Sequence, residues 1–275
     1  WSSDVCSSDL IDLRIIMELI FLAFIGLIVG TAVGLTGVGG GAVMTPLLII
    51  FTNLELAAVI AVDLMFASIT KTSAAINHAK NKNIDWGILR SMWWGSIPAV
   101  MLVLFFVITY NLFALDFLLP FIGVVLIISG ILMGISHESQ SFSRSLENRF
   151  PDQFHKIQKP LTTLGGSLIG TLVALTSIGA GAIGAIMLRA LHPLKMRPKI
   201  LVGTDTTHAI PVAFIAGLGY LSFGYLDWKV LGCLLVGSIP GSLLGSYLTD
   251  RLKPHWVKVM LGLAIMVSGI KLTFF

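Results

Sequence analysis

The sequence predicts an all-α protein that crosses the membrane several times and is built from two internal repeats. Three observations lead to this fold class: the composition, the recurrence of long apolar segments, and the likeness of the two halves of the chain. Hydrophobic residues make up 56% of the 275 residues and charged residues 12%, and this charged share is about half that of an ordinary soluble domain. A soluble fold cannot bury so much apolar surface, whereas a bilayer solvates it directly.

Apolar segments long enough to cross about 30 Å of hydrocarbon, which takes roughly 20 residues each, recur along the chain. We expect them at residues 13–51, 55–79, 86–110, 113–136, 161–191, 198–224, 226–249 and 254–275. They predict seven to eight spans, with about four hydrophobic segments in each repeat. The stretch 137–160 is polar and rich in charged side chains, so we expect it to be a cytoplasmic loop between the repeats.

The first ten residues differ from the rest of the chain. They are polar and rich in serine, share no periodicity with the apolar run that follows, and resemble translated cloning sequence. We therefore expect residues 1–10 to be a non-native leader. Cys6 lies in this leader, so it is not considered as a functional residue. The other cysteine, Cys233, lies in an apolar segment, so neither a disulfide framework nor a cysteine-based metal site follows.

The two halves of the chain are copies of each other. Residues 30–42 align with residues 170–182, with eight of the 13 positions identical. Three further segments recur in the same order at nearly the same offset: Asp-Trp at 85 and 227, Gly-Ser-Ile-Pro at 95 and 237, and Ser-Gly-Ile at 129 and 268. This order indicates a duplication, with repeat 1 at residues 11–136 and repeat 2 at residues 161–275, an architecture common in secondary transporters.

Glycines break the first apolar segment of each repeat. A helix broken inside a membrane frees backbone groups, which are tolerated only where they face protein or a water-filled cavity. The segment after the break can begin as a half-helix whose free N–H groups attract an anion. Close helix packing at small residues is the alternative explanation. The candidate anion ligands are the residues of the two breaks: Thr36, Gly37, Gly39, Gly40, Gly41, Thr176, Ser177, Gly179 and Gly181.

The distribution of Lys and Arg predicts the orientation of the chain. These residues concentrate in the loops near residues 80, 144–159, 189–199 and 251–253, and such loops are usually cytoplasmic. Plain alternation of eight spans would place the 189–199 loop outside. If each glycine-broken segment enters and leaves on one side, the conflict disappears. The repeats would then be inverted, each with three full crossings and one re-entrant hairpin.

Charged side chains inside apolar segments are costly in a membrane and are usually functional. Asp63 and Asp205 hold matching places in the two repeats. Because desolvation disfavours the charged form of a carboxyl, they are the candidate proton-coupling residues. Lys71 and His208 are the candidate positive groups for holding an anion. The alternatives are hydrogen bonds between helices for the acids and for His208, and snorkelling of Lys71 to the membrane surface.

Two further aspartates and the remaining histidines point to structure instead. Asp85 and Asp227, each followed by Trp, lie at expected helix starts, where a carboxylate caps free N–H groups. Four histidines lie in or beside loops without the spacing of metal ligands: His137, His155, His192 and His255. We expect neither a metal site nor a cofactor.

The duplicated glycine segment at 37–42, its shorter copy at 179–182, the paired acids, and the Asp-Trp and Gly-Ser-Ile-Pro segments together resemble the sulfite exporter TauE/SafE family. This family is also called the toluene-sulfonate uptake permease family, and the resemblance covers about residues 15–275. It implies a membrane transporter of small sulfur-containing anions, such as sulfite, sulfoacetate or other organosulfonates, coupled to protons, with no direction implied. Ser177 and Ala180 replace two glycines of the first copy, so unequal half-sites are expected.

The residues and the resemblance together predict a multi-pass transporter of the cytoplasmic membrane that binds an anion at the repeat interface and works by alternating access. A passive anion channel with re-entrant half-helices is the alternative. An enzyme is not expected, because no serine lies in a Gly-x-Ser-x-Gly-like turn. The expected partners are a small anion, protons and the lipid bilayer, with a homodimer left open. The net charge of +4 lies in short loops, which indicates topology control and not nucleic-acid binding.

Overall fold

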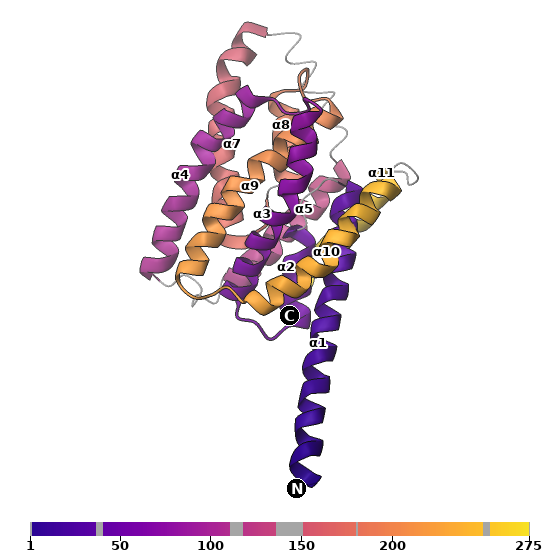
Figure 1. The fold of residues 1–275 in the computed structure, drawn as a ribbon. Coiled ribbons are helices and arrows are strands. Elements are labelled where there is room, and N and C mark those ends of the chain that lie inside the picture. The colour runs from indigo at the N-terminus through magenta and orange to yellow at the C-terminus, as the bar shows by residue number, and fades with distance from the viewer. Residues whose placement is uncertain are drawn as a thin grey trace.

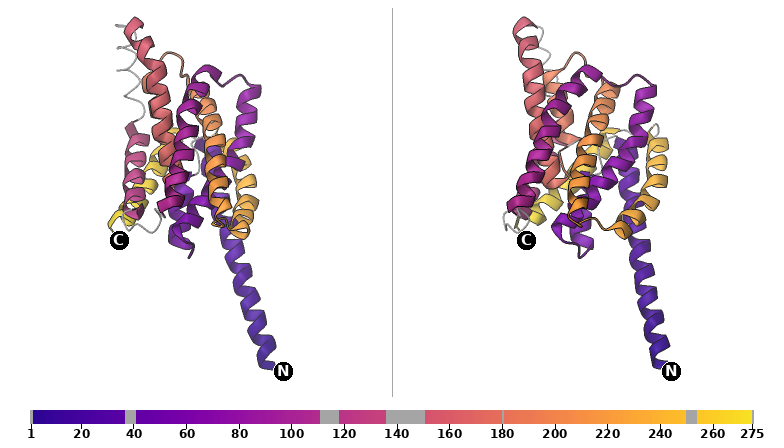
Figure 2. Two further views of the ribbon diagram at one scale, coloured as in Figure 1. Left: turned by 90° about the vertical axis from the view of Figure 1, so that its left-hand side faces the viewer. Right: turned by 60° about the vertical axis from the view of Figure 1, so that its left-hand side comes forward.

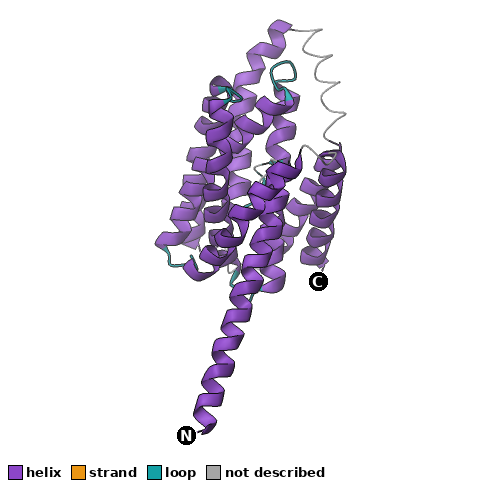
Figure 3. Ribbon diagram, turned by 45° about the vertical axis from the view of Figure 1, so that its right-hand side comes forward, coloured by secondary structure: helices purple, strands orange, loops and turns teal. Residues whose placement is uncertain are grey.

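The computed structural model describes residues 2–36, 41–110, 118–135, 151–179, 181–249 and 254–274. In this part of the chain the structure consists of helices joined by short loops (Figure 3). The predicted all-α fold class is therefore confirmed. Five of the described helices are long and apolar enough to cross a membrane, as a multi-pass membrane protein requires.

The helices follow the predicted segments closely. In the first half they are α1 (Ser2–Thr36), α2 (Gly41–Phe51), α3 (Leu56–Lys80), α4 (Trp86–Tyr110) and α5 (Leu118–Ile135). In the second half they are α7 (Pro151–Thr176), α8 (Ala182–Leu191), α9 (Pro198–Ser222), α10 (Trp228–Thr249) and α11 (Pro254–Phe274). Each glycine-broken segment forms two helices, and each other segment forms one.

The first helix of each half begins earlier than expected. α1 starts at Ser2 and its N-terminal part projects beyond the bundle (Figures 1 and 2), so residues 2–10 are helical, while their non-native origin stays a prediction. α7 starts at Pro151, so the last ten residues of the expected loop 137–160 are helical; residues 136–150 lie outside the described residues. Lys156 and Lys159 are exposed on α7, and charges here mark a helix end outside the hydrocarbon.

Helices from the two halves pack against each other in matching pairs. α1 packs against α10, and α4 packs in the same way against α7; α5 pairs with α11. Gly26 and Gly30 on α1 lie against the backbone of α10, while Gly166 and Gly170 on α7 lie against α4. A Cβ atom at any of these glycines would lie 2.2 to 2.5 Å from a carbonyl oxygen. Lipid is as apolar as leucine, so such close backbone contact is a main source of helix association in membranes.

α3 and α9 form the central pair, and they run antiparallel. Met65 on α3 contacts Gly217 near the end of α9, whereas Asn83, just beyond the end of α3, contacts Gly203 near the start of α9. Inverted repeats require matched helices to run in opposite directions, as these two do. The inverted arrangement of the repeats in the membrane stays a prediction.

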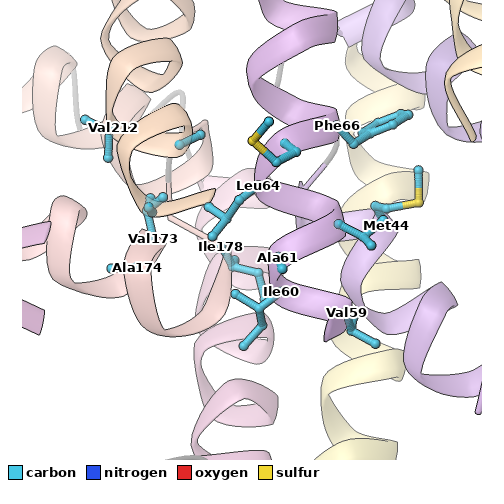
Figure 4. Packing of buried hydrophobic residues seen from close by; sticks show 14 of the residues in the cluster. Met44, Val59, Ile60, Ala61, Leu64, Phe66, Val173, Ala174, Ile178 and Val212 are labelled. Carbon is cyan, nitrogen blue, oxygen red and sulfur yellow. The ribbon is translucent and has the colours of Figure 1, made fainter. Parts of the chain in front are cut away.

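The apolar core surrounds α3. Figure 4 shows Leu64 of α3 between Met44 of α2 on one side and Val173 and Val212 of α7 and α9 on the other, with Phe66 of α3 on the side of Met44. These side chains are buried in one continuous cluster. The same helix carries two of the predicted functional residues, so the core holds their backbone in a fixed position.

Each broken segment is a helical hairpin and not a kinked span. In the second half, Met187 on α8 lies against Gly165 on α7. At the end of the hairpin, the Thr162 hydroxyl and His192 Nε2 lie 2.8 Å apart. α8 therefore runs back along α7 toward the end from which α7 came. Such a hairpin is what a segment that enters and leaves on one side requires.

The first half contains the same hairpin. The rings of Phe21 on α1 and Phe51 at the end of α2 have their centroids 5.5 Å apart in an edge-to-face contact. Phe21 lies about four turns before the end of α1 and Phe51 ends α2, so their contact shows that α2 also returns along α1. The residues that connect the two helices, 37–40, lie outside the described residues.

Candidate functional site

The break between α7 and α8 consists of backbone in unusual conformations. Ser177 has φ 58°, Gly179 φ 129° and Gly181 φ 126°, values that L side chains rarely adopt and that favour glycine. Gly181 is the N-cap residue of α8 and supplies no side-chain hydrogen bond to it. α8 therefore begins inside the protein without a cap from its own segment.

Two side chains fasten the end of α7 just before the break. The Thr176 hydroxyl donates to Leu172 O at 2.7 Å and accepts a hydrogen bond from Ile178 N at 3.1 Å. The buried Tyr220 hydroxyl of α9 donates to Ala174 O at 2.6 Å. Thr176, a predicted anion ligand, thus uses its hydroxyl to hold the break, and its role in binding an anion stays a prediction.

Asp205 of α9 lies at the start of α8. The Gly181 N–H is directed at its carboxyl. A Cβ atom at Gly184 would lie 2.2 Å from Asp205 Oδ1, so the missing side chain of this glycine leaves room for the carboxyl. Asp205 is buried, and its Oδ1 atom has no hydrogen-bond partner among the described residues. A carboxylate is stabilised at this end of a helix, where N–H groups are free and the helix dipole is positive.

Asp63 of α3 holds the matching place at the start of α2. Its Oδ2 atom accepts a hydrogen bond from the Thr45 hydroxyl, and the Thr45 N–H also faces the carboxyl. From the other half of the chain, the Ser177 hydroxyl faces the same carboxyl without hydrogen-bond geometry. Asp63 is fully buried, and its Oδ1 atom has no partner.

Lys71 is the positive charge at the centre of this region. It is only 5% exposed, so it lies inside the bundle and does not snorkel to the membrane surface. It interacts electrostatically with Asp205 and with Asp63. With both carboxyls ionised, this group of three side chains carries one more negative than positive charge.

His208 lies one turn after Asp205 on α9 and is fully buried. Its Nε2 atom is 3.0 Å from the hydroxyl of Ser96 on α4, which is the expected hydrogen bond between helices. Its Nδ1 atom has no hydrogen-bond partner, and the ring lies within electrostatic reach of Lys71. The Trp93 indole N–H donates to His208 O at 3.3 Å, which places a tryptophan beside the site.

These side chains form one buried polar cluster, to which we refer as the central cluster: Asp63, Lys71, Ser177, Asp205 and His208. Four atoms of the cluster are buried without a hydrogen-bond partner in the described structure: Asp63 Oδ1, Ser177 Oγ, Asp205 Oδ1 and His208 Nδ1. A buried polar atom without a partner costs about 1–3 kcal/mol, so several together call for a ligand or water molecules. The central cluster is therefore the candidate binding site.

Comparison with known proteins identifies the family. The model of the family described as "Sulfite exporter TauE/SafE" matches residues 22–272. The chain belongs to the sulfite exporter TauE/SafE family. It is a multi-pass membrane transporter, and the resemblance read from its repeated motifs is confirmed.

Curated relatives carry names of the same kind. The chain is 33% identical over 261 residues to the probable membrane transporter protein YjnA of Bacillus subtilis, covering 91% of this chain and 98% of the relative. It is 27% identical to the probable membrane transporter protein MJ0441 of Methanocaldococcus jannaschii, covering 94% and 97%. No solved structure gave a significant match. The matches therefore span nearly the full length of these relatives.

The first half-site of this TauE/SafE protein is described only in part. Thr36 ends α1 and Gly41 begins α2, but their side chains are not described. The predicted ligands Gly37, Gly39 and Gly40 lie outside the described residues. Their roles stay predictions.

Sequence reasoning did not identify three residues that contact the cluster. Thr45, Ser96 and Gly184 touch Asp63, His208 and Asp205 respectively. Ser96 lies in the repeated Gly-Ser-Ile-Pro segment, and this repetition could have identified it as a candidate residue of the site. Thr45 and Gly184 follow the glycine breaks by one turn, so their places could have been inferred from the half-helices.

The two Asp-Trp segments have the predicted structural role. Asp85 Oδ1 accepts hydrogen bonds from the N–H groups of Gly87 and Ile88 at 3.0 and 3.1 Å. Asp227 Oδ1 accepts matching bonds at the start of α10. Both aspartates are therefore N-caps, as expected.

Proposed function

We propose that this TauE/SafE protein is a secondary transporter that moves a small sulfur-containing anion, such as sulfite, sulfoacetate or another organosulfonate, together with protons. The observation that carries the proposal is the central cluster. It lies where α3 and α9, one from each half of the chain, cross in the core, which is where transporters built from repeats bind their substrates. Alternating access would follow from movement of one repeat against the other.

The donors in the cluster suit a sulfite or sulfonate group. Such a group presents three oxygens that accept hydrogen bonds. The Lys71 ammonium can donate to it, and the Ser177 hydroxyl and His208 Nδ1 have no partner in the described structure. A positive charge with two neutral groups favours a small oxyanion over an apolar molecule.

The charge balance of the cluster supports coupling to protons. Asp63 and Asp205 together outweigh Lys71 by one negative charge when both are ionised. Another anion added to this buried site would be repelled by a like charge, and such repulsion is strong in a medium of low dielectric constant. Protons on the carboxyls remove that repulsion, so anion and proton would bind together.

A cavity at one end of the bundle offers an entrance. It has a volume of about 620 Å³ and is lined by the loop before α3 and the loop before α10, among them Glu55, Tyr225 and Lys229. Ala58 also lines it and lies five residues before Asp63 on α3, or about 7.5 Å along the helix. The loops at this end, at residues 52–55 and 223–227, contain no Lys or Arg, so we expect this end to face outward.

The test is transport by the purified protein in proteoliposomes that contain a pH-sensitive dye. Sulfite, sulfoacetate, methanesulfonate, sulfate and chloride would be added in turn, with protein-free vesicles as the control for permeation of neutral acids. The proposal predicts a saturable change of internal pH with a sulfur-containing anion and none with chloride. Anion flux that does not saturate and moves no protons would identify a passive channel and contradict the proposal.

A further inference from the structure

The carboxyl group of Asp205 lies at the N-terminal end of α8. The Gly181 N–H is directed at the Asp205 carboxyl, and Gly184 provides the space in which Oδ1 lies. In the described part of the chain, no side chain donates a hydrogen bond to this carboxyl. The place that a bound anion would take at this half-helix is therefore filled by an anionic side chain of the protein itself.

A second, independent observation indicates that this region also receives a ligand. Among the described residues, the buried atoms Ser177 Oγ, His208 Nδ1 and Asp205 Oδ1 have no hydrogen-bond partner. A side chain serving only as a helix cap would not require unpaired polar atoms on two neighbouring elements. These atoms are explained if a further group can bind where the carboxyl now lies.

Few charged groups act on Asp205. Lys71 of α3 is the charge that acts on it most directly, and Lys71 also interacts with Asp63 on the same helix. His208 lies one turn along α9 and faces Lys71. In the described part of the chain, α4, α7 and α8 contribute no charge that acts on this carboxyl. An added anion would therefore meet one carboxylate at the half-helix and one lysine beside it.

We infer that the Asp205 carboxylate occupies the anion site of α8 in the substrate-free protein, and that a substrate anion takes its place when this carboxyl binds a proton. This inference rests on the proposed function and names the residue that couples anion to proton. The carboxylate and the substrate compete for the Gly181 N–H and for Lys71. Protonation removes the negative charge of the carboxyl, so its interaction with the Gly181 N–H weakens and the substrate binds there.

The experiment measures binding of methanesulfonate to the purified full chain by calorimetry. A sulfonate keeps its charge throughout the range from about pH 5 to pH 8, in which buried carboxyls can titrate, so any pH dependence belongs to the protein. Titrations in two buffers with different ionisation enthalpies give the number of protons taken up per anion bound. The inference predicts uptake of close to one proton and, where the carboxyl is ionised, an affinity that falls about tenfold per pH unit.

The Asp205→Asn variant removes the competing charge with little change of shape. Its affinity should no longer depend on pH, and binding should take up no proton. Asp85→Asn is the matched control, because asparagine also caps helices and Asp85 lies outside the central cluster; it should retain the pH dependence. Elution by gel filtration checks that the variants are folded, and Asp205→Ala provides a second neutral variant with the same expected result.

The outcomes separate the inference from the proposed function. If the unmodified protein binds methanesulfonate or sulfite without taking up a proton, or if Asp205→Asn keeps the pH dependence, the inference is overturned while anion transport stands. If no sulfur-containing anion binds at any pH, the proposed function falls and the inference falls with it.

Discussion

The two half-helix starts hold matching acids but differ in what surrounds them. At α2, the Thr45 hydroxyl donates a hydrogen bond to Asp63. At α8, the residue that matches Thr45 is Ala185, and the residue that matches Met44 is Gly184. The Asp63 carboxyl is thus held by a side-chain hydrogen bond, whereas the Asp205 carboxyl faces the Gly181 N–H and lies in the space beside Gly184.

This difference shows how a duplicated structure can separate two tasks. The repeat provides each half-helix with an acid at its start, and this acid stabilises free N–H groups. An acid held by a hydroxyl remains in place, so Asp63 suits a fixed structural contact. An acid without such a partner can move, so Asp205 suits the coupling step. Changes to the central cluster should therefore have unequal effects in the two halves.

The largest effect is expected for Lys71→Met, which removes the positive charge that both acids share. Breaking a buried charge cluster costs about 3–5 kcal/mol, so anion uptake should fall at least about a hundredfold. Uptake of a labelled sulfur-containing anion into proteoliposomes measures it. Lys159→Met, at an exposed position on α7, is the matched control and should retain most uptake. Equal losses of uptake in the two variants would show that Lys71 is not part of the binding site.

The next effect is expected for Gly184→Ala, because the new Cβ atom would lie 2.2 Å from Asp205 Oδ1. Overpacking of this kind costs about 1–3 kcal/mol, so uptake should fall about tenfold. In an Asp205→Ser background the smaller side chain relieves the contact, and the same glycine change should have little further effect. Additive effects in this double-mutant cycle would show that the two residues do not interact.

A smaller effect is expected when the Thr45 hydroxyl is removed from the first half-site, or when a hydroxyl is introduced at the matching position 185 of the second. Thr45→Val should lower the free energy of unfolding by about 1–3 kcal/mol, because a buried carboxyl loses its donor. Ala185→Thr should supply Asp205 with the donor that Asp63 has, and thereby slow proton-coupled uptake without lowering stability. Thermal unfolding and uptake measure the two results. Slower uptake in Thr45→Val with unchanged stability would reverse the roles assigned to the two acids.

The smallest effect concerns the ends of the hairpins, where His192 in the second half matches Thr52 in the first. Burial lowers the pKa of His192 from 6.5 to about 4, and the positive charge of Lys195 adds to this shift. The folded protein then binds fewer protons at this site than the unfolded chain between those values. The unfolding free energy should therefore decrease as the pH falls from about 6.5 to about 4.

Denaturation at a series of pH values measures this dependence. His192→Gln keeps a polar group of similar size beside Thr162 and cannot titrate, so this variant should lose less stability over the same interval. An identical pH dependence in the variant and the unmodified protein would assign the effect to other groups.

Much of the fold could be predicted from the sequence, because the bilayer imposes simple rules on helices. Apolar segments give the helices, and glycine clusters give the breaks that divide α1 from α2 and α7 from α8. The start of α7 was misplaced, because the charges around Lys156 resemble a loop although they lie on a helix that extends past the apolar region. Local composition does not distinguish these two cases.

The site could be predicted only as a set of residue types. Asp63, Lys71, Asp205 and His208 stand out because ionisable residues are rare inside membrane segments. Their partners do not stand out, since the contact of His208 with Ser96 depends on how α9 crosses α4. The local bonds that engage the Thr176 hydroxyl depend on the conformation of the break, which residue spacing does not define.

The most direct test of the account is the infrared difference spectrum produced by adding methanesulfonate to the protein. Protonation of a carboxylate on anion binding appears as a gain of the carboxylic-acid C=O stretch. The account predicts this gain in the unmodified protein and in Asp63→Asn, and its loss in Asp205→Asn. Loss of the band in Asp63→Asn and its retention in Asp205→Asn would contradict the assignment of the coupling step to Asp205.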